Sequence, residues 1–389
     1  MEISVICFTL SGFELMKQLV DDDKISFQYF CKGDALNKYS GFEISNDRRV
    51  IYINDSLEQW SKEQFDKNRI LIFIGALGIA VRAVSGCVHD KLSDSPVIVI
   101  DDMGKFVIPV LSGHYGGANE ITVLIADKLS DYSNPVAVIT TSTDIHNKFA
   151  VDVFAKKNRL IIENKAGIAK VSSRVLSGKM INIYIPNKQH VDMTSYEAFC
   201  KKHPGEVNLV FADSSNHAGS NETGSNRTIS NHAGTHGANN NIMDVTIDCQ
   251  TKALLSLKSK KYAIGIGCKR GKTCNDIETF VMKKIQELAI SMDEVFCIAS
   301  IDVKADEKGI IDFANKYNLD FKTFSKEELA DVEGDFLESE FVKNQVGVGN
   351  VCERAAVAVW DFDASLILSK QAEDGVTVAI STGRKLISF

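Results

Sequence analysis

The chain has 389 residues and a composition close to the average for a folded protein, with 44% hydrophobic and 24% charged residues. A chain of this length and composition can bury sizeable cores, which excludes wholesale disorder. Lys and Arg number 44 against 51 Asp and Glu, so the net charge is −7. Nucleic acids and membrane surfaces bind proteins that carry clustered positive charge. Because this chain is acidic overall, neither is an expected partner. An anionic ligand would need a local basic pocket.

The N-terminus and the cysteines indicate a cytoplasmic protein. Residues 1–14 lack the basic segment and the small-residue cleavage site of a secretory signal. The longest apolar stretch, at 70–81, is shorter than the roughly 20 residues of a membrane span. The nine cysteines are scattered, and no pair has the spacing of zinc ligands. We therefore expect a reduced, cytoplasmic, soluble protein.

Short apolar runs alternate with helical patterns in the first half of the chain. The runs predict buried strands at 3–10, 70–74, 97–101, 135–140 and 181–185. Apolar residues at helical spacing predict an amphipathic helix over 118–129. The alternation of strand, glycine-rich turn and helix is typical of βαβ units, so we expect an N-terminal, mostly parallel α/β sheet region.

A polar tract interrupts the chain. Residues 215–234 repeat a five-residue pattern such as SNHAG and have almost no apolar side chains. A pentapeptide solenoid needs an apolar residue in each repeat, so we interpret 213–241 as a flexible, solvated linker. The predicted domains are an N-terminal α/β region at 1–206 (with subdomains at about 1–132 and 133–206), a low-complexity linker region at 207–260, and a smaller C-terminal α/β domain at 261–389.

The predicted C-terminal domain repeats the alternation of strands and helices. Strands are expected at 261–267, 295–303, 320–324 and 376–381, and helices at 273–289 and 307–317. Ser325 and Glu328 form a capping box that predicts the start of another helix. Both halves of the chain are therefore expected to be α/β structures.

Four loops connect a predicted strand to a helix, at the edge where open α/β sheets bind ligands. The first contains Gly75, Gly78 and Arg82. Its glycines allow the backbone to approach a ligand, and a helix start offers unpaired N–H groups to an anion. A tight turn with a surface arginine is the structural alternative. The glycine spacing does not match a dinucleotide-binding fingerprint.

The second loop is rich in glycine and polar residues. It contains Ser112, His114, Gly116, Gly117, Asn119 and Glu120. A structural turn rarely needs so many different polar side chains, which favours a functional role. His114 could act as a general acid or base near neutral pH. Ser112 and His114 are only two residues apart and the GxSxG motif is absent, so a serine-hydrolase pair is not expected.

The other two loops lie in the predicted C-terminal domain. They contain Gly267, Cys268, Lys269 and Arg270 in one case and Gly347, Gly349 and Glu353 in the other. The basic residues provide the local anion site that an acidic protein would need. Between the loops, Asp302 and Lys304 follow a strand, where a solvated turn is an equal alternative. Cys268 is better explained as a packing residue than as a nucleophile.

These motifs, taken in order, resemble one known family. The chain is similar to the cobalt-precorrin-5A hydrolase family of anaerobic cobalamin biosynthesis through GALGIAVR, LSGHYGGANE, GIGCKRG, SIDVKADE, GVGNVCE and GVTVAIS. The resemblance covers most of residues 50–200 and 261–381. LSGHxGGAN and GVGxVCE are its most specific parts.

The resemblance implies a hydrolase that opens the δ-lactone of cobalt-precorrin-5A, releases acetaldehyde and yields cobalt-precorrin-5B. The tetrapyrrole substrate carries many carboxylates and brings its own cobalt, so the resemblance implies neither a cofactor nor a metal site of the protein's own. We expect His114 to be the general base, with Glu120 and Ser112 as further catalytic candidates. Expected substrate-binding residues are Gly75, Gly78, Arg82, Gly116, Gly117, Asn119, Gly267, Cys268, Lys269, Arg270, Asp302, Lys304, Gly347, Gly349 and Glu353.

Other readings of the sequence remain open. A non-catalytic protein that shields the corrinoid intermediate could use the same basic loops without a general base. A nucleotide-dependent oxidoreductase is disfavoured because neither glycine loop fits its fingerprint. A homodimer and transient contacts with neighbouring pathway enzymes are further expectations, whereas nucleic acid and membrane are not expected partners.

Overall fold

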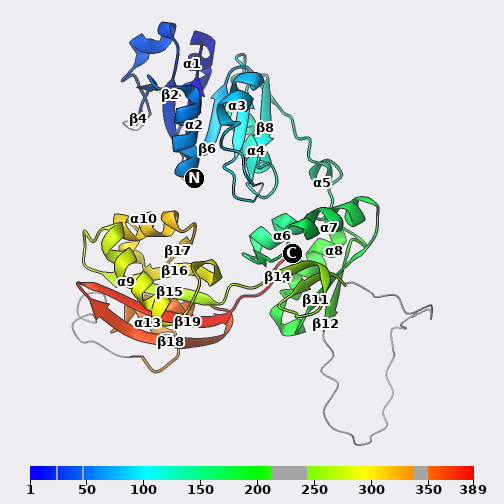
Figure 1. Ribbon diagram of the computed structural model, residues 1–389, viewed down its shortest axis with the longest axis vertical. Coiled ribbons are helices and arrows are strands. Elements are labelled where there is room, and N and C mark those ends of the chain that lie inside the picture. The colour runs from blue at the N-terminus through cyan, green and yellow to red at the C-terminus, as the bar shows by residue number, and fades with distance from the viewer. Residues whose placement is uncertain (23–24, 46–47, 91, 212–242, 337–348) are drawn as a thin grey trace, which may run out of the picture. The chain divides into compact units, whose positions relative to one another are not determined.

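Figure 1 shows the computed structural model of the chain. It describes residues 1–22, 25–45, 48–90, 92–211, 243–336 and 349–389. The chain divides into two compact units, Met1–Val153 (unit 1) and Phe154–Phe389 (unit 2). This division falls well before the boundary expected near residue 206. The predicted linker tract at 213–241 lies outside the described residues.

Unit 1 is built on a seven-stranded sheet. In sheet order its strands are β5 (Ile51–Tyr52), β2 (Ser26–Cys31), β1 (Glu2–Cys7), β6 (Ile70–Ile74), β7 (Val97–Ile100), β8 (Phe106–Leu111) and β9 (Val136–Ala137). Neighbouring strands are parallel except for β7 and β8. The expected mostly parallel sheet is therefore confirmed, whereas the strand expected at 135–140 shortens to the two residues of β9.

Helices cover both faces of this sheet. They are α1 (Leu10–Met16), α2 (Leu57–Asp66), α3 (Leu77–Val84) and α4 (Ala118–Lys128). Unit 1 also contains a 3-10 helix at Asp34–Tyr39, a hairpin of β3 (Glu43–Ser45) and β4 (Arg48–Arg49), and α5 (Ser142–Ile145), and the division between the units falls within α6 (Val151–Lys157). In β6, Ile70, Ile72 and Ile74 share a core with α1 and α4, and Leu71 and Phe73 share another with α2 and α3. Because side chains alternate along a strand, the sheet is buried on both faces.

The reversed direction of β8 separates the two predicted loops of unit 1. The Gly75 N–H donates to the carbonyl oxygen of Ile100 at the carboxyl end of β7, whereas Leu111 pairs with Val97 at the amino end. The loop at 75–78 (the GALG loop) and the loop at 111–117 (the LSGHYGG loop) therefore lie at opposite edges of the sheet. Because β9 runs parallel to β8, the segment that follows β9 reaches the same edge as the LSGHYGG loop.

The first half of unit 2 contains a five-stranded sheet. Its strands in order are β10 (Ile161–Ile162), β14 (Ala253–Lys258), β13 (Met243–Ile247), β11 (Ile181–Ile185) and β12 (Val207–Phe211), accompanied by α7 (Ala166–Leu176), α8 (Met193–Lys202) and a 3-10 helix at Lys188–His190. β12, β13 and β14 fall within the range that composition assigned to the linker. Their apolar residues complete the sheet on both sides of the polar tract, so the linker region is narrower than expected.

The second half of unit 2 contains another five-stranded sheet with two long antiparallel strands (Figure 1). Its order is β17 (Asp320–Phe324), β16 (Val295–Ile301), β15 (Tyr262–Cys268), β19 (Val376–Arg384) and β18 (Phe362–Glu373). Its helices are α9 (Cys274–Glu287), α10 (Lys308–Lys316), α11 (Lys326–Ala330) and α13 (Val351–Ala358), with 3-10 turns at Met292–Glu294 and Asp302–Lys304. The capping box of Ser325 and Glu328 at α11 is confirmed.

The C-terminus ties the two sheets of unit 2 together. Ile387 bridges to Val191, and the Phe389 ring lies 4.8 Å from that of Phe154 and 5.0 Å from that of Tyr196. Such aromatic packing adds to the stability gained from burial alone. The terminal residues thus fix the position of one sheet relative to the other within unit 2.

Gly265 provides a test of the packing in unit 2. A Cβ atom on Gly265 would lie 1.8 Å from the carbonyl oxygen of Cys352, so α13 could not keep its position on β15. We expect Gly265→Ala to lower the free energy of unfolding by about 3 kcal/mol. Urea denaturation followed by the fluorescence of Trp360 measures this loss. Gly86→Ala is the control, since its Cβ would meet no atom within 4 Å; equal losses in both variants would contradict the packing argument.

Candidate active site

The His114 imidazole lies between two carboxylates in unit 1. Its Nε2 is 2.9 Å from Oδ1 of Asp144, and its Nδ1 is 3.2 Å from Oδ1 of Asp152. The Thr143 hydroxyl also lies 3.1 Å from Nε2. We call His114, Thr143, Asp144 and Asp152, together with Asn119, the His114 site. Both imidazole nitrogens face an acceptor, so the arrangement favours the doubly protonated, charged ring.

Tight backbone packing gives the His114 loop its shape. Ser112, which follows β8, has a φ of 54°, a left-handed conformation that is uncommon for a residue other than glycine. A Cβ atom on Gly116 would lie only 2.3 Å from that of Ser112, so only glycine fits there. The loop then enters α4 at Gly117, whose φ is 90°. The glycines of this motif therefore fold the loop back on itself and present His114.

Two segments bring the carboxylates to His114. Asp144 lies in α5, in the segment that follows β9, and its Oδ2 accepts a hydrogen bond from Asn119 Nδ2 on α4. Asn119 also donates to the Thr141 hydroxyl at 2.9 Å. Asp152 lies in the first turn of α6, where the helix N-terminus favours a negative charge. Asn119 therefore orients the carboxylate that faces Nε2.

The two aspartates differ in their access to a ligand. The side chain of Asp144 is 35% exposed and that of Asp152 is 8% exposed, with His114 at 16%. Burial lowers the pKa of His114, but the hydrogen bond to Asp152 and the charges of Asp152 and Asp144 outweigh it, so the pKa is raised above its usual 6.5. Asp152 is therefore placed to hold the ring, and Asp144 is placed to meet a ligand.

The structure gives the other residues of this loop different surroundings. The Ser112 hydroxyl donates to the carbonyl oxygen of Asp94 at 2.7 Å, so its proton is not shared with a base. Glu120 is exposed on the first turn of α4. The Gly117 N–H donates to the His114 carbonyl oxygen at 3.1 Å, so it is already used within the loop. Among the other residues predicted from this loop, Asn119 is therefore the one that takes part in the His114 site.

The GALG loop forms a separate feature at the opposite edge of the sheet. Gly75 has a φ of 154°, and a Cβ there would lie 3.1 Å from the Phe8 ring. The Arg82 side chain reaches back to Gly78, where a Cβ would lie 3.4 Å from its guanidinium. Arg82 is exposed and makes no ion pair with the described residues. The structure does not bring these three residues to His114.

The basic residues of the C-terminal domain are largely paired within the protein. Arg270 lies 2.7 Å from Asp306, and Lys304 lies 2.9 Å from Glu307. Glu307 is buried and also accepts the N–H of Gly271, which ties the two loops together. These pairs neutralise part of the anion site expected from the sequence. Lys269 is exposed next to them, and Asp302 begins the 3-10 turn that carries Lys304.

The remaining predicted residues of this domain lie where α13 meets the sheet. Gly267 contacts Thr377 of β19, and burial raises the pKa of the Cys268 thiol. Glu353 is 1% exposed, and its carboxylate accepts the Lys370 N–H and the Asn350 amide at 2.6 Å. Gly349 lies just before α13, while Gly347 lies outside the described residues. The position of Glu353 favours a structural role that joins α13 to β18.

No helix among the described residues is long and apolar enough to cross a membrane. Within the same described part of the chain, no group of three His, Cys, Asp or Glu side chains is placed to hold a metal ion.

Known proteins resemble both halves of this chain. Residues 59–144 match the family described as Cobalamin synthesis G N-terminal, and residues 262–381 match Cobalamin synthesis G C-terminus. A cobalt-precorrin-5A hydrolase of Priestia megaterium is 29% identical and is covered over 94% of its length, with 98% of this chain. A cobalt-precorrin-5A hydrolase of Salmonella typhimurium is 27% identical, with 97% of each chain covered.

The chain belongs to the cobalt-precorrin-5A hydrolase family. Among solved structures, CobE, a protein from the cobalamin (vitamin B12) biosynthetic pathway, is 27% identical with a TM-score of 0.30, over 31% of this chain and 89% of that chain. The two family matches and the two curated relatives confirm the resemblance inferred from the sequence motifs. The first family match contains His114, Asn119 and Asp144, and it ends at Asp144.

Sequence reasoning missed Thr143, Asp144 and Asp152 of this family member. Asp144 belongs to a polar run, TTSTD, that follows a predicted strand, and this position was the available signal. Asp152 stands among apolar residues in VDVF, and the packing of an apolar helix face does not require an acidic residue at that position. Nothing in the spacing of these residues from His114 indicates that they meet it.

The raised pKa of His114 gives a test of the site. We expect the His114 pKa to lie above 6.5 in the full chain and to fall in Asp152→Asn, because that variant removes the buried charge facing Nδ1. Titration of histidine ring carbons by NMR, with assignment through His114→Gln, measures both values.

The raised pKa of His114 also makes the stability of unit 1 depend on pH in a definite direction. Since the folded-state pKa is raised, the charged ring stabilises unit 1 fully below about pH 6.5, and this contribution is lost as the pH rises through the folded-state value. In the NMR titration, an unchanged His114 pKa in Asp152→Asn would contradict the contact assigned between Nδ1 and Asp152.

Proposed function

We propose that this chain is a cobalt-precorrin-5A hydrolase that opens the δ-lactone of its substrate, releases acetaldehyde and leaves cobalt-precorrin-5B. Family membership and near full-length similarity to two proteins of that name support the activity. The observation that supports a place for the chemistry is the His114 imidazole held between Asp144 and Asp152. Lactone opening transfers an acyl group to water and therefore needs a base for the water and an acid for the departing oxygen.

Asp144 is the proposed general base. Its carboxylate is the more exposed of the two, and Asn119 holds one oxygen while the other faces His114. A water molecule bound at this carboxylate can attack the lactone carbonyl carbon and pass a proton to Asp144. The acyl carbon–oxygen bond of the lactone then breaks, so the oxygen of water remains in the new carboxylic acid.

His114 is the proposed general acid. Its raised pKa and its two carboxylate neighbours favour the charged ring, which carries a proton on Nε2 for the departing alkoxide. Asp152 acts as a positioning residue, because it holds Nδ1 and stabilises the charge. This assignment reverses the order of roles expected from the sequence, where His114 was the base. Glu120, at the exposed start of α4, has no described contact with the ring.

The second step removes the two-carbon fragment. The alcohol freed from the lactone loses its proton, its carbon–oxygen bond becomes the carbonyl of acetaldehyde, and the bond to the macrocycle breaks. The electron pair moves into the macrocycle, which takes up a proton. Cobalt arrives in the substrate, so the proposed reaction needs no resident cofactor. A cytoplasmic location, a homodimer and transient contacts with neighbouring pathway enzymes stay predictions.

Removal of either proposed catalytic group tests this mechanism. We expect Asp144→Asn and His114→Ala each to lower kcat for acetaldehyde release by about 10²–10⁴-fold, because each removes a proton-transfer group. The assay is anaerobic incubation with cobalt-precorrin-5A, with acetaldehyde and the product mass as readouts. Asp131→Asn, an exposed carboxylate of the same unit, is the matched control.

Two results would contradict the mechanism. Activity within twofold of wild type in Asp144→Asn, together with a large loss in Glu120→Gln, would transfer the base to Glu120. Tight binding of the substrate by the wild-type chain with no acetaldehyde release would instead support the non-catalytic binding protein.

A further inference from the structure

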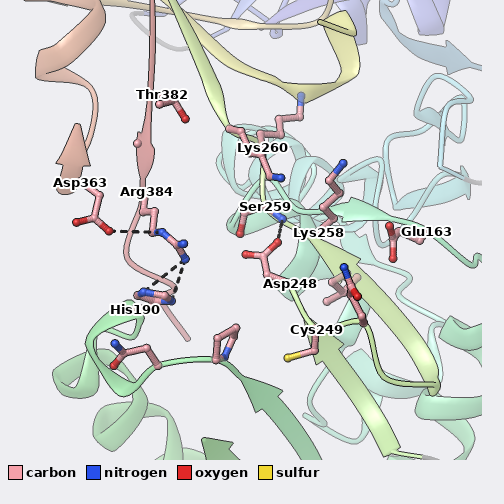
Figure 2. Close-up of a pocket in the computed structure, with 16 residues that line it drawn as sticks. Glu163, His190, Asp248, Cys249, Lys258, Ser259, Lys260, Asp363, Thr382 and Arg384 are labelled. Carbon is pink, nitrogen blue, oxygen red and sulfur yellow. Dashed lines mark hydrogen bonds and ion pairs between the residues drawn. The ribbon is translucent and has the colours of Figure 1, made fainter. Parts of the chain in front are cut away.

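We propose that a cavity in unit 2 binds a carboxylate-rich ligand of tetrapyrrole size. The cavity has a volume of about 980 Å³ and is lined by residues of both sheets of unit 2 (Figure 2). It is formed by residues other than those of the His114 site and the glycine loops. The choice of ligand rests on the proposed function, whereas the argument for an anion rests on the cavity itself.

The cavity lies at the carboxyl ends of three neighbouring strands. β14, β13 and β11 are parallel, and the residues that immediately follow them line the cavity. Ligands of open α/β sheets bind at this edge, where the loops diverge and leave space. Thr382 and Arg384, at the end of β19, complete the wall on the side of the C-terminal sheet. The position therefore matches a binding crevice.

The cationic side chains of the cavity are only partly neutralised. Lys258 pairs with Glu294 at 2.7 Å, and Arg384 pairs with Asp363 at 3.5 Å. Lys260 and Lys261 make no ion pair with any described residue.

The carboxylates on the cavity wall leave those two lysines unpaired. The Asp248 carboxylate accepts the Ser259 N–H at 2.8 Å, and Figure 2 shows Glu163 on the far side of Lys258 from Lys260. The lysine pair at the end of β14 is therefore available to an anionic ligand.

Lys260 is held in a position that disfavours its own charge. It is half-buried, and burial lowers its pKa; together with repulsion from the nearby Arg159 guanidinium, burial outweighs the opposite effect of the Asp293 and Asp320 charges. A partly desolvated ammonium group without a partner is costly, and a carboxylate from a ligand offsets that cost. Arg384 can join the same ligand, because its guanidinium already extends across the cavity wall to within 3.4 Å of His190.

The size of the cavity selects among anions. Pockets of about 300–1,000 Å³ enclose molecules of drug size, and this cavity is at the upper end of that range. A small di- or tricarboxylate would leave most of the cavity filled with water. A macrocycle with peripheral carboxylates, such as the substrate of the proposed reaction, fills it and reaches several cations at once.

Binding of uroporphyrin III, an octacarboxylate macrocycle, to the full-length chain tests this proposal. Quenching of porphyrin fluorescence gives Kd for wild type and for Lys260→Gln, Arg384→Gln and the control Lys252→Gln, an exposed lysine outside the cavity. We expect roughly tenfold weaker binding for each cavity variant, because each removes a charged hydrogen-bond donor. Added salt should weaken binding to wild type. Equal affinity in all four proteins would overturn the proposal.

Two further ligands separate charge from size. A tetracationic porphyrin of similar dimensions should bind at least about tenfold more weakly than uroporphyrin, and equal binding would overturn the assignment of an anion site. Citrate should compete only weakly. Strong, Lys260-dependent binding of citrate without binding of uroporphyrin would overturn the macrocycle in favour of a small acid.

The porphyrin-binding experiment and the acetaldehyde assay can each succeed or fail without the other. Lys260-dependent uroporphyrin binding in a chain that releases no acetaldehyde would uphold the cavity and refute the hydrolase. Normal acetaldehyde release with uroporphyrin binding that is insensitive to Lys260→Gln and Arg384→Gln would refute the cavity and uphold the hydrolase.

Discussion

The contact of one imidazole with two aspartates is the interaction on which the proposed catalytic site of unit 1 depends. Asp144 and Asp152 place two negative charges around His114, and only a protonated ring satisfies both. The fold supplies this arrangement through the direction of its strands. β8 reverses the parallel sheet and β9 follows it, so the segments that carry His114 and Asp144 end at the same edge. A proton donor and a carboxylate acceptor therefore lie side by side without any residue contributed by unit 2.

The sequence was informative where a local pattern alone determines a structure. The strands β1, β6 and β7 are nearly continuous apolar runs, and the capping box at Ser325 needs only two residues three positions apart. His114 was identified because a loop with many polar residues rarely serves packing. Asp144 and Asp152 were missed because their contact with His114 depends on the antiparallel pairing of β8, which no periodicity reports.

Charge was harder to interpret than hydrophobicity. Arg270 and Lys304 appeared to form an anion site, but each is paired with an acidic neighbour in space. The strands β13 and β14 were assigned to a linker because the polar tract dominates the local composition. With that assignment, no strand was expected to end at this point of the chain. The position of Lys258, Lys260 and Lys261 at the end of a strand in a folded sheet was therefore not predicted. Positive charge is therefore still local in this acidic chain, and two lysines without an ion pair to any described residue, Lys260 and Lys261, lie in the unit 2 cavity.

The pH dependence of kcat/KM for acetaldehyde release, measured in wild type and in Asp152→Asn, tests the role of His114 most directly. Because His114 must carry a proton to act as the acid, activity should fall as the pH rises through its raised pKa, above 6.5. In Asp152→Asn this decline should move to lower pH, because the buried charge that stabilises the protonated ring is gone. A decline at the same pH in both proteins would contradict the assignment of His114 as the acid held by Asp152.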